Sequence, residues 1–152
     1  MATPSKGRWR WANVPIPEPH VFGLFVSVAL HTYRPWRITD RREPARTIGW
    51  SVVGASVPCL AWAVRTAGDA DVEEPAALLT GGPYAFSRNP MYVAWTALYV
   101  GIALLSNSLW PFVLSPAVLA ATHGIVRREE RLLARAFGDE YRTYRRDVPR
   151  YL

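Results

Sequence analysis

The sequence has few of the residues that build disulfide frameworks and metal centres. It contains one cysteine, Cys59, and three histidines. A single cysteine excludes an intrachain disulfide, and we interpret Cys59, which lies inside an apolar block, as a small buried hydrophobe. The cysteines, histidines and acids do not have the spacing of zinc or calcium ligands, so we predict no metal site.

Charged residues are missing from long parts of the chain. Residues 47–64 and residues 89–126 contain no Asp, Glu, Lys or Arg. Apolar blocks of about 18 residues or more are typical of membrane spans. The second block, at 38 residues, is too long for one crossing and suits a hairpin of two helices, near 91–106 and 110–126. Its natural turn is Ser106-Asn107-Ser108.

The remaining segments complete a membrane protein. Residues 20–33 form a shorter apolar helix, and residues 1–19 form a basic, proline-rich arm. Apolar residues recur every three to four positions in residues 127–152, which predicts a surface helix interrupted by Gly138. We therefore predict a single domain over 1–152 with an all-α fold. It is a polytopic membrane helix bundle of 3–5 transmembrane helices with a helical hairpin and a C-terminal amphipathic helix.

The net charge of +6 comes from arginines and lysines that flank the apolar blocks. This arrangement is typical of membrane-interface anchors, and we expect no nucleic-acid partner. On the predicted topology, thirteen Lys and Arg lie on the side of the termini, against five in residues 34–46. We expect an integral protein of the cell membrane with both termini cytoplasmic. The five arginines of 34–46 are interpreted as a solvated loop that faces lipid phosphates.

Two polar clusters lie at the ends of the predicted hairpin. A loop with Arg88 precedes it, and Glu129 and Glu130 follow it. Antiparallel helices of similar length bring both ends to one side, about 8–10 Å apart. We therefore expect Arg88 and Glu130 to meet, either as functional groups or as an ion pair that ties the loop to the tail. His123 lies deeper on the helical face of Glu130, and is interpreted either as a functional residue or as an interhelical hydrogen-bonding group.

An ordered set of motifs links these clusters to a known family. The motifs are Gly82-Pro83-Tyr84, Arg88-Asn89-Pro90-Met91-Tyr92, Glu129-Glu130, Phe137-Gly138, Tyr141, Tyr144 and Val148-Pro149-Arg150. Together they resemble the isoprenylcysteine carboxyl methyltransferase and phospholipid methyltransferase family. The resemblance covers about residues 78–150, which it marks as a cofactor-binding half.

The resemblance implies an integral membrane enzyme that transfers a methyl group from S-adenosyl-L-methionine to a lipophilic small molecule or lipid at the cytosolic membrane face. Carried over from the family, the catalytic residues would be Arg88 and Glu130. The cofactor-binding residues would be Leu78, Leu79, Tyr84, Asn89, Pro90, Met91, Tyr92 and Glu129. Aromatic faces attract a sulfonium cation, and a carboxylate accepts hydrogen bonds from amine or ribose groups, so these residue types suit the chemistry.

Two positions depart from the family pattern, and they keep other functions open. The family has His where this chain has Asn89, and its carboxyl methyltransferases have a substrate-contacting Arg where this chain has Ile125. Asn89 cannot titrate near neutral pH, so activity should not depend on a proton there. The alternatives are a membrane reductase of the sterol type that uses a reduced nicotinamide cofactor, and a non-catalytic membrane protein that retains the fold.

Overall fold

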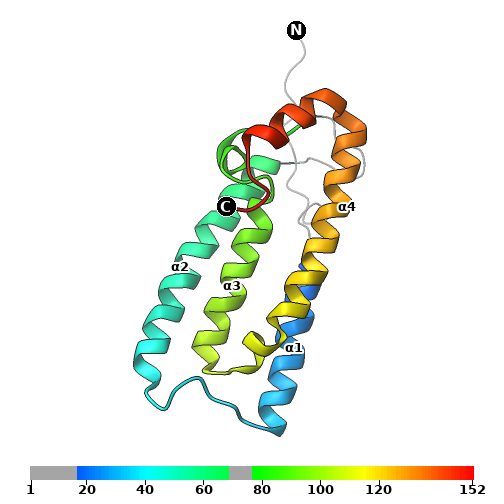
Figure 1. The fold of residues 1–152 in the computed structure, drawn as a ribbon. Coiled ribbons are helices and arrows are strands. Elements are labelled where there is room, and N and C mark those ends of the chain that lie inside the picture. The colour runs from blue at the N-terminus through cyan, green and yellow to red at the C-terminus, as the bar shows by residue number, and fades with distance from the viewer. Residues whose placement is uncertain (1–16, 69–76) are drawn as a thin grey trace.

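The structure, a computed structural model, describes residues 17–68 and 77–152 and is an all-helical bundle (Figure 1). Its elements are α1 (Glu18–Tyr33), α2 (Arg42–Ala67), the short 3₁₀ helix η2 (Gly82–Ala85), α3 (Pro90–Ser106) and α4 (Trp110–Asp147). Within the described residues the only β-type pairing is an isolated bridge between Arg37 and Ser108. The predicted fold class is confirmed. The predicted arm at 1–19 lies almost entirely outside the described residues.

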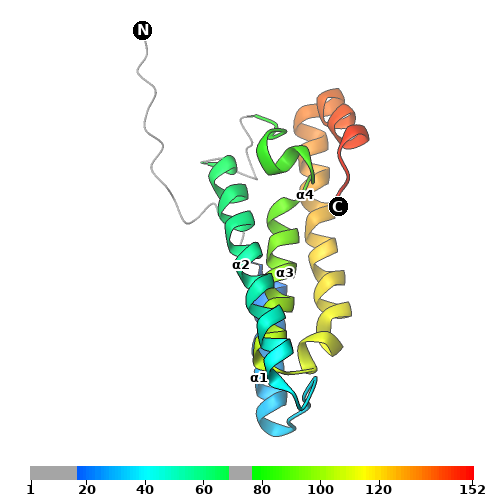
Figure 2. The ribbon, with the colours of Figure 1, turned by 90° about the vertical axis from the view of Figure 1, so that its left-hand side faces the viewer.

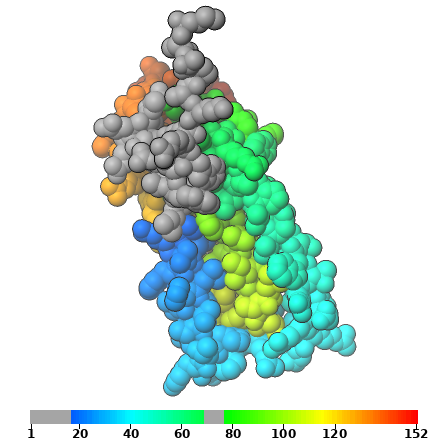
Figure 3. Space-filling view, turned by 180° about the vertical axis from the view of Figure 1, so that it is seen from behind, coloured from blue at the N-terminus to red at the C-terminus, as the bar shows by residue number. Residues whose placement is uncertain are grey.

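Helix α3 lies in the middle of the bundle. It packs along α2 on one side and contacts α1 and α4 on the other, while α1 runs beside α4 (Figures 1 and 2). From behind, α3 is visible between α1 and α2 (Figure 3). The α1–α2 connection and the α3–α4 turn lie at one end of the bundle, and η2 and the C-terminal segment lie at the other. The polar clusters before α3 and late in α4 therefore share one end.

The helical hairpin begins and turns where the sequence predicts, but its second helix, expected near 110–126, continues into the predicted surface helix and ends at Asp147. Pro90 begins α3, and Pro111 lies in the first turn of α4, where a missing N–H leaves no intrahelical bond unmade. Asn107 ends α3 with a left-handed backbone (φ 49°), and its N–H donates to the carbonyls of Ala103 and Leu104. A left-handed residue at this position is a common way to stop a helix, and Asn tolerates it better than most side chains.

Gly138 redirects α4 at the same end as η2. Its backbone has φ 50° and ψ −114°, outside the helical region, so the helix breaks there into a long segment and a short final one. The predicted interruption is confirmed, and glycine is the residue that adopts this conformation at low cost. After the break, the chain turns back over the bundle end and the C-terminal segment runs down toward α3 (Figure 1).

Two glycines bring α2 and α3 close together. A Cβ on Gly49 would lie 3.1 Å from the carbonyl oxygen of Gly101, and a Cβ on Gly101 would lie 3.3 Å from that of Gly49. The sequence predicts a small-residue packing face on this helix, formed by Gly49, Ser51, Gly54, Ala55 and Ser56. Only Gly49 and Ser56, seven residues apart, are buried. The other three are exposed because 100° per residue turns them to the outer surface.

The outer surface of the bundle is apolar. Phe22, Phe25 and Val28 of α1 and Trp50 of α2 are each more than half exposed. Side chains of this kind are expected against lipid, since a soluble surface rarely groups them. Among the described residues, α2 is long and apolar enough to cross a membrane, and α3 is a shorter apolar helix. Cys59, expected to be buried, is exposed.

Candidate active site

The loop before α3 is anchored on α2 and on the end of α4. A Cβ on Gly82, which has φ 59°, would lie 2.9 Å from Thr66 Oγ1, so the loop lies directly on α2. The ring of Tyr84 packs on the cluster of Ala63, Val64 and Met91. Its carbonyl oxygen accepts a hydrogen bond of 2.7 Å from the hydroxyl of Tyr144. These contacts hold the loop at the end of the hairpin.

Glu130 lies between two arginines. Arg88 Nη1 is 3.1 Å from Oε1, and Arg150 donates to Oε2 from Nε at 3.0 Å and from Nη2 at 2.8 Å. The side chains of Arg88 and Glu130 are only 7% and 9% exposed. The paired arrangement raises the pKa of Arg150, chiefly through its hydrogen bonds to Glu130. The expected meeting of Arg88 and Glu130 is therefore found, with Arg150 as a third member.

Arg88 retains a buried donor that no described residue uses. Its Nη1 also donates to Tyr141 Oη at 3.3 Å. Its Nε is buried and has no hydrogen-bond partner among the described residues. A buried donor without an acceptor costs free energy, about 1–3 kcal/mol for a typical group. This N–H is therefore suited to an anionic ligand group such as a carboxylate.

Asn89 joins the loop to the C-terminal segment. Its side-chain nitrogen donates to the carbonyl oxygen of Arg150 at 3.1 Å and lies 3.4 Å from Glu130 Oε1. The hydroxyl of Ser87 donates to the same carbonyl, and the backbone N–H of Arg88 donates to the carbonyl of Pro149. The residue at the family's histidine position thus serves as a neutral hydrogen-bonding link.

Glu129 has a different environment from its neighbour. Its Oε1 accepts a hydrogen bond of 2.7 Å from the hydroxyl of Tyr92, and no ion pair forms on it among the described residues. Burial raises the pKa of Glu129, and the hydrogen bond from Tyr92 opposes that rise only in part. Burial also raises the pKa of the Tyr84 hydroxyl, with further contributions from Tyr144 and Glu129. In the described part of the chain, Glu129 is therefore a partly buried carboxylate near two tyrosines, without an ion-pair partner.

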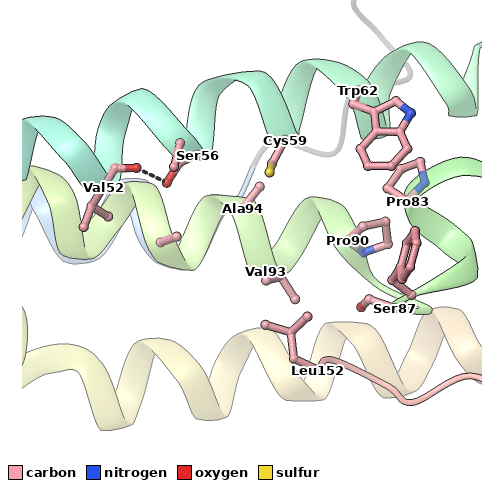
Figure 4. Close-up of a pocket in the computed structure, with 13 residues that line it drawn as sticks. Val52, Ser56, Cys59, Trp62, Pro83, Ser87, Pro90, Val93, Ala94 and Leu152 are labelled. Carbon is pink, nitrogen blue, oxygen red and sulfur yellow. Dashed lines mark hydrogen bonds between the residues drawn. The ribbon is translucent and has the colours of Figure 1, made fainter.

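A narrow apolar groove of about 430 Å³ starts beside this site and runs between α2 and α3 (Figure 4). Cys59 and Trp62 line it from α2, and Val93 lines it from α3, pointing toward Leu152. Pro83, Ser87 and Pro90 close its upper end, at the loop that carries Arg88. The groove therefore ends at Ser87, the residue that precedes Arg88.

A sequence model of one family, described as phospholipid methyltransferase, matches residues 47–140. The chain belongs to the phospholipid methyltransferase family. It is also 35% identical, over 75 residues, to the cobalt-zinc-cadmium resistance protein CzcN of Cupriavidus metallidurans. That alignment covers 49% of this chain and 34% of CzcN, so the chain spans about a third of that relative's length.

The match to the phospholipid methyltransferase family includes the loop before α3, the hairpin and both glutamates. The structure places the predicted site residues in several different surroundings. Tyr84 and Tyr92 lie near Glu129, and Asn89 lies on Glu130. Pro90 lines the apolar groove. Leu78 lines a separate hollow of about 490 Å³ beside Tyr144 and Glu140, and Leu79 is half-buried. The Met91 side chain is buried against Ala63 and Val64 of α2.

Three further residues of this candidate site were not among the predicted site residues. They are Arg150, Tyr141 and Tyr151, and all follow the matched range. Arg150 and Tyr141 belong to the motifs on which the resemblance depends, so a signal for them existed. Tyr151 Oη lies 3.0 Å from His123 Nδ1. In the described part of the chain, His123 therefore hydrogen-bonds to the C-terminal segment and not, as one of the two interpretations expected, to another helix. Its functional role stays a prediction.

Proposed function

We propose that this chain transfers a methyl group from S-adenosyl-L-methionine to a lipophilic acceptor at the cytosolic face of the cell membrane, with both termini in the cytoplasm. The observation that carries the proposal is the contrast within the Glu129-Glu130 pair. Glu130 is neutralised by Arg88 and Arg150, whereas Glu129 has a tyrosine hydroxyl and, within residues 17–68 and 77–152, no ion-pair partner. A partly buried, unneutralised carboxylate favours a cationic or hydrogen-bond-donating ligand.

The residues present fit the cofactor. S-adenosyl-L-methionine, when bound, would supply the methyl group from its sulfonium centre. Glu129 would accept hydrogen bonds from the cofactor's amine or ribose hydroxyls, and the faces of Tyr84 and Tyr92 would attract a cation with about 0.5–2 kcal/mol. The unpartnered Nε of Arg88 suits the carboxylate of an amino-acid group. In this role Arg88 binds the cofactor while its Nη1 stays on Glu130.

Glu130 acts chiefly as a positioning residue in this proposal. Both of its oxygens accept hydrogen bonds from arginines, so it holds the loop of Arg88 and the segment of Arg150 in register. Since in-line methyl transfer needs close alignment and little water, a fixed loop and tail over the site favour the reaction. The C-terminal segment excludes water by lying across the hairpin end.

The apolar groove supports a lipophilic acceptor. Its lining is apolar except for Ser56, Cys59 and Ser87, and it opens along the membrane-facing side of the bundle. A hydrocarbon chain placed there would enter from the bilayer and leave its polar end near Ser87, next to Arg88. We propose that the groove takes the chain of the methyl acceptor.

A binding titration separates the possible functions. The purified protein in detergent is titrated with S-adenosylhomocysteine and, in parallel, with reduced nicotinamide adenine dinucleotide phosphate. The proposal expects saturable binding of the first and none of the second. Binding of the nicotinamide cofactor alone would indicate a reductase, and binding of neither would indicate a non-catalytic protein.

A further inference from the structure

The end of the bundle opposite the active site carries a fixed loop between α1 and α2. This arginine loop, residues 34–41, lies against the α3–α4 turn. The Leu109 N–H donates to the Trp36 carbonyl at 2.9 Å, and the Trp110 indole N–H donates to the Arg34 carbonyl at 2.9 Å. Arg37 and Ser108 form the isolated β-bridge. The loop has little regular structure of its own, and the turn of the hairpin fixes its shape.

Asn107 adds two further bonds at the same place. Its side-chain nitrogen donates to the Thr39 carbonyl at 2.8 Å, and its side-chain oxygen accepts from the Thr39 N–H at 3.2 Å. Asn107 is only 4% exposed. A buried amide that satisfies both backbone groups of one loop residue holds that residue in a single position. The backbone of the arginine loop is therefore preorganised.

The side chains on this backbone and on the start of α2 carry excess positive charge. Residues 34–46 contain five arginines and two acids, a net charge of +3. All five arginines, Arg34, Arg37, Arg41, Arg42 and Arg46, are exposed. Asp40 precedes Arg41 and Glu43 follows Arg42 in the sequence. None of the five arginines nevertheless forms an ion pair within the described part of the chain. Within the described part of the chain, these exposed guanidinium groups therefore remain available to an anionic partner.

Aromatic residues place this charge at the depth of lipid head groups. Trp36 and Trp110 pack edge to face, with ring centroids 5.5 Å apart, beside a hollow of about 350 Å³ lined also by Arg34 and Pro35. Tyr33, next to the loop, is 90% exposed, and Trp50 on α2 is 58% exposed. Trp and Tyr concentrate where a bilayer's hydrocarbon meets its head groups.

We propose that the arginine loop and the start of α2 bind the phosphate head groups of anionic phospholipids in the leaflet opposite the active site. A guanidinium forms two parallel hydrogen bonds to a phosphate and is favoured over ammonium for such contacts. The neighbouring apolar surface of α1 and α2 ties this charge to the bilayer rather than to a soluble anion. This proposal does not depend on the methyltransferase activity, because its residues lie at the other end of the bundle.

The test compares two triple variants that each remove three positive charges. Arg37→Gln/Arg41→Gln/Arg42→Gln changes the proposed surface, and Arg142→Gln/Arg145→Gln/Arg146→Gln changes exposed arginines near the active-site end. Each protein, in a neutral detergent, is titrated with phosphatidylglycerol and with phosphatidylcholine, and bound lipids are counted by native mass spectrometry. We expect wild type and the control to prefer phosphatidylglycerol, and the loop variant to bind it at least tenfold more weakly.

Several outcomes would overturn the proposal. They are equal binding of the two lipids by wild type, an equal loss in both triple variants, or displacement of the lipid by millimolar inorganic phosphate, which would indicate a soluble-anion site. If the loop triple variant loses helicity by circular dichroism, the single variants Arg37→Gln and Arg41→Gln replace it. Each should weaken phosphatidylglycerol binding by at least twofold, and the absence of any change in both also contradicts the proposal.

Discussion

Glu129 and Glu130 are consecutive on α4, yet one carboxylate receives two arginines and the other receives a tyrosine hydroxyl. Successive residues on a helix are 100° apart, so Glu130 faces the Arg88 loop and the C-terminal segment while Glu129 faces Tyr92 of α3. The carboxylate of Glu130 is thus used within the fold, and that of Glu129 is available to a ligand.

Replacing Glu129 with Gln should weaken S-adenosylhomocysteine binding while the fold persists. Loss of a charged acceptor in a partly buried site costs about 1–3 kcal/mol, or roughly fivefold to 150-fold in affinity. Calorimetric titration measures the effect. The matched control is Asp139→Asn, since Asp139 is an exposed acid on the same helix, 91% exposed and paired with Arg142. Equal binding by the Glu129 variant and wild type would remove Glu129 from the site.

Acidification should weaken cofactor binding through Glu129. Burial raises the pKa of this carboxyl above its ordinary value of 4.5, so it loses its charge at a higher pH than an exposed glutamate. The stability of the ligand-free fold has the opposite pH dependence. Because the pKa of Glu129 is higher in the folded than in the unfolded state, the free energy of unfolding falls as pH rises from 4.5 through the folded pKa. Titrations at several pH values should show the affinity loss in wild type and a flatter profile in Glu129→Gln.

The Arg150–Glu130 contact should be energetically coupled. Arg150→Gln leaves one buried carboxylate oxygen without its charged donors, and we expect a loss of about 1–3 kcal/mol in unfolding free energy. Glu130→Gln should be costly as well, and the double variant should lose less than the two single losses added together. Arg142→Gln, which breaks an exposed pair, should change stability by no more than about 0.5 kcal/mol. Additive losses would show that the two side chains act independently.

Gly138→Ala should destabilise the active-site end of α4. A Cβ at Gly138 meets no heavy atom within 4 Å, so the cost comes from its positive φ of 50°, and such strain is typically about 1–3 kcal/mol. Gly124→Ala is the matched control, since it also meets no atom but lies within the regular helix. That control should gain about 0.5–1 kcal/mol. Thermal unfolding in detergent compares the two, and a gain in both would contradict the strain argument.

Filling the groove should separate acceptor binding from cofactor binding. Ala97 of α3 lines the groove, and Ala97→Phe should displace a hydrocarbon chain while leaving S-adenosylhomocysteine affinity unchanged. Ala117→Phe on the exposed side of α4 is the control. Binding of a fluorescent long-chain lipid reports on the groove. Unchanged lipid binding in Ala97→Phe would exclude the groove as the acceptor's site.

The hairpin could be predicted from the sequence because its signals are local. The absence of charge over 89–126, the turn at 106–108 and the prolines at both helix starts specify two antiparallel helices, although the continuation of α4 to Asp147 was not predicted. Once the helices are antiparallel, the meeting of Arg88 and Glu130 follows from geometry. The break at Gly138 could also be predicted, since glycine is a poor helix former inside an amphipathic segment.

The partner of each side chain could not be predicted in the same way. Nothing local to Arg150 or Tyr151 indicates that the C-terminal segment turns back to reach Glu130 and His123. The burial of Met91 against α2 depends on how two helices rotate about their axes, which an almost uniformly apolar α3 does not specify. For the same reason, the exposure of Cys59 was not foreseen.

The mutual approach of Gly49 and Gly101 has an evolutionary consequence. Each glycine leaves room for the backbone of the opposite helix, and neither can be made smaller. A larger residue at one position therefore has no compensating substitution at the other. Divergence at this contact requires the facing backbone and the side chains of Leu105 or Val53 to give way together, whereas the exposed positions of α2 are free to change singly. Across a lineage, the crossing point of α2 and α3 should change last.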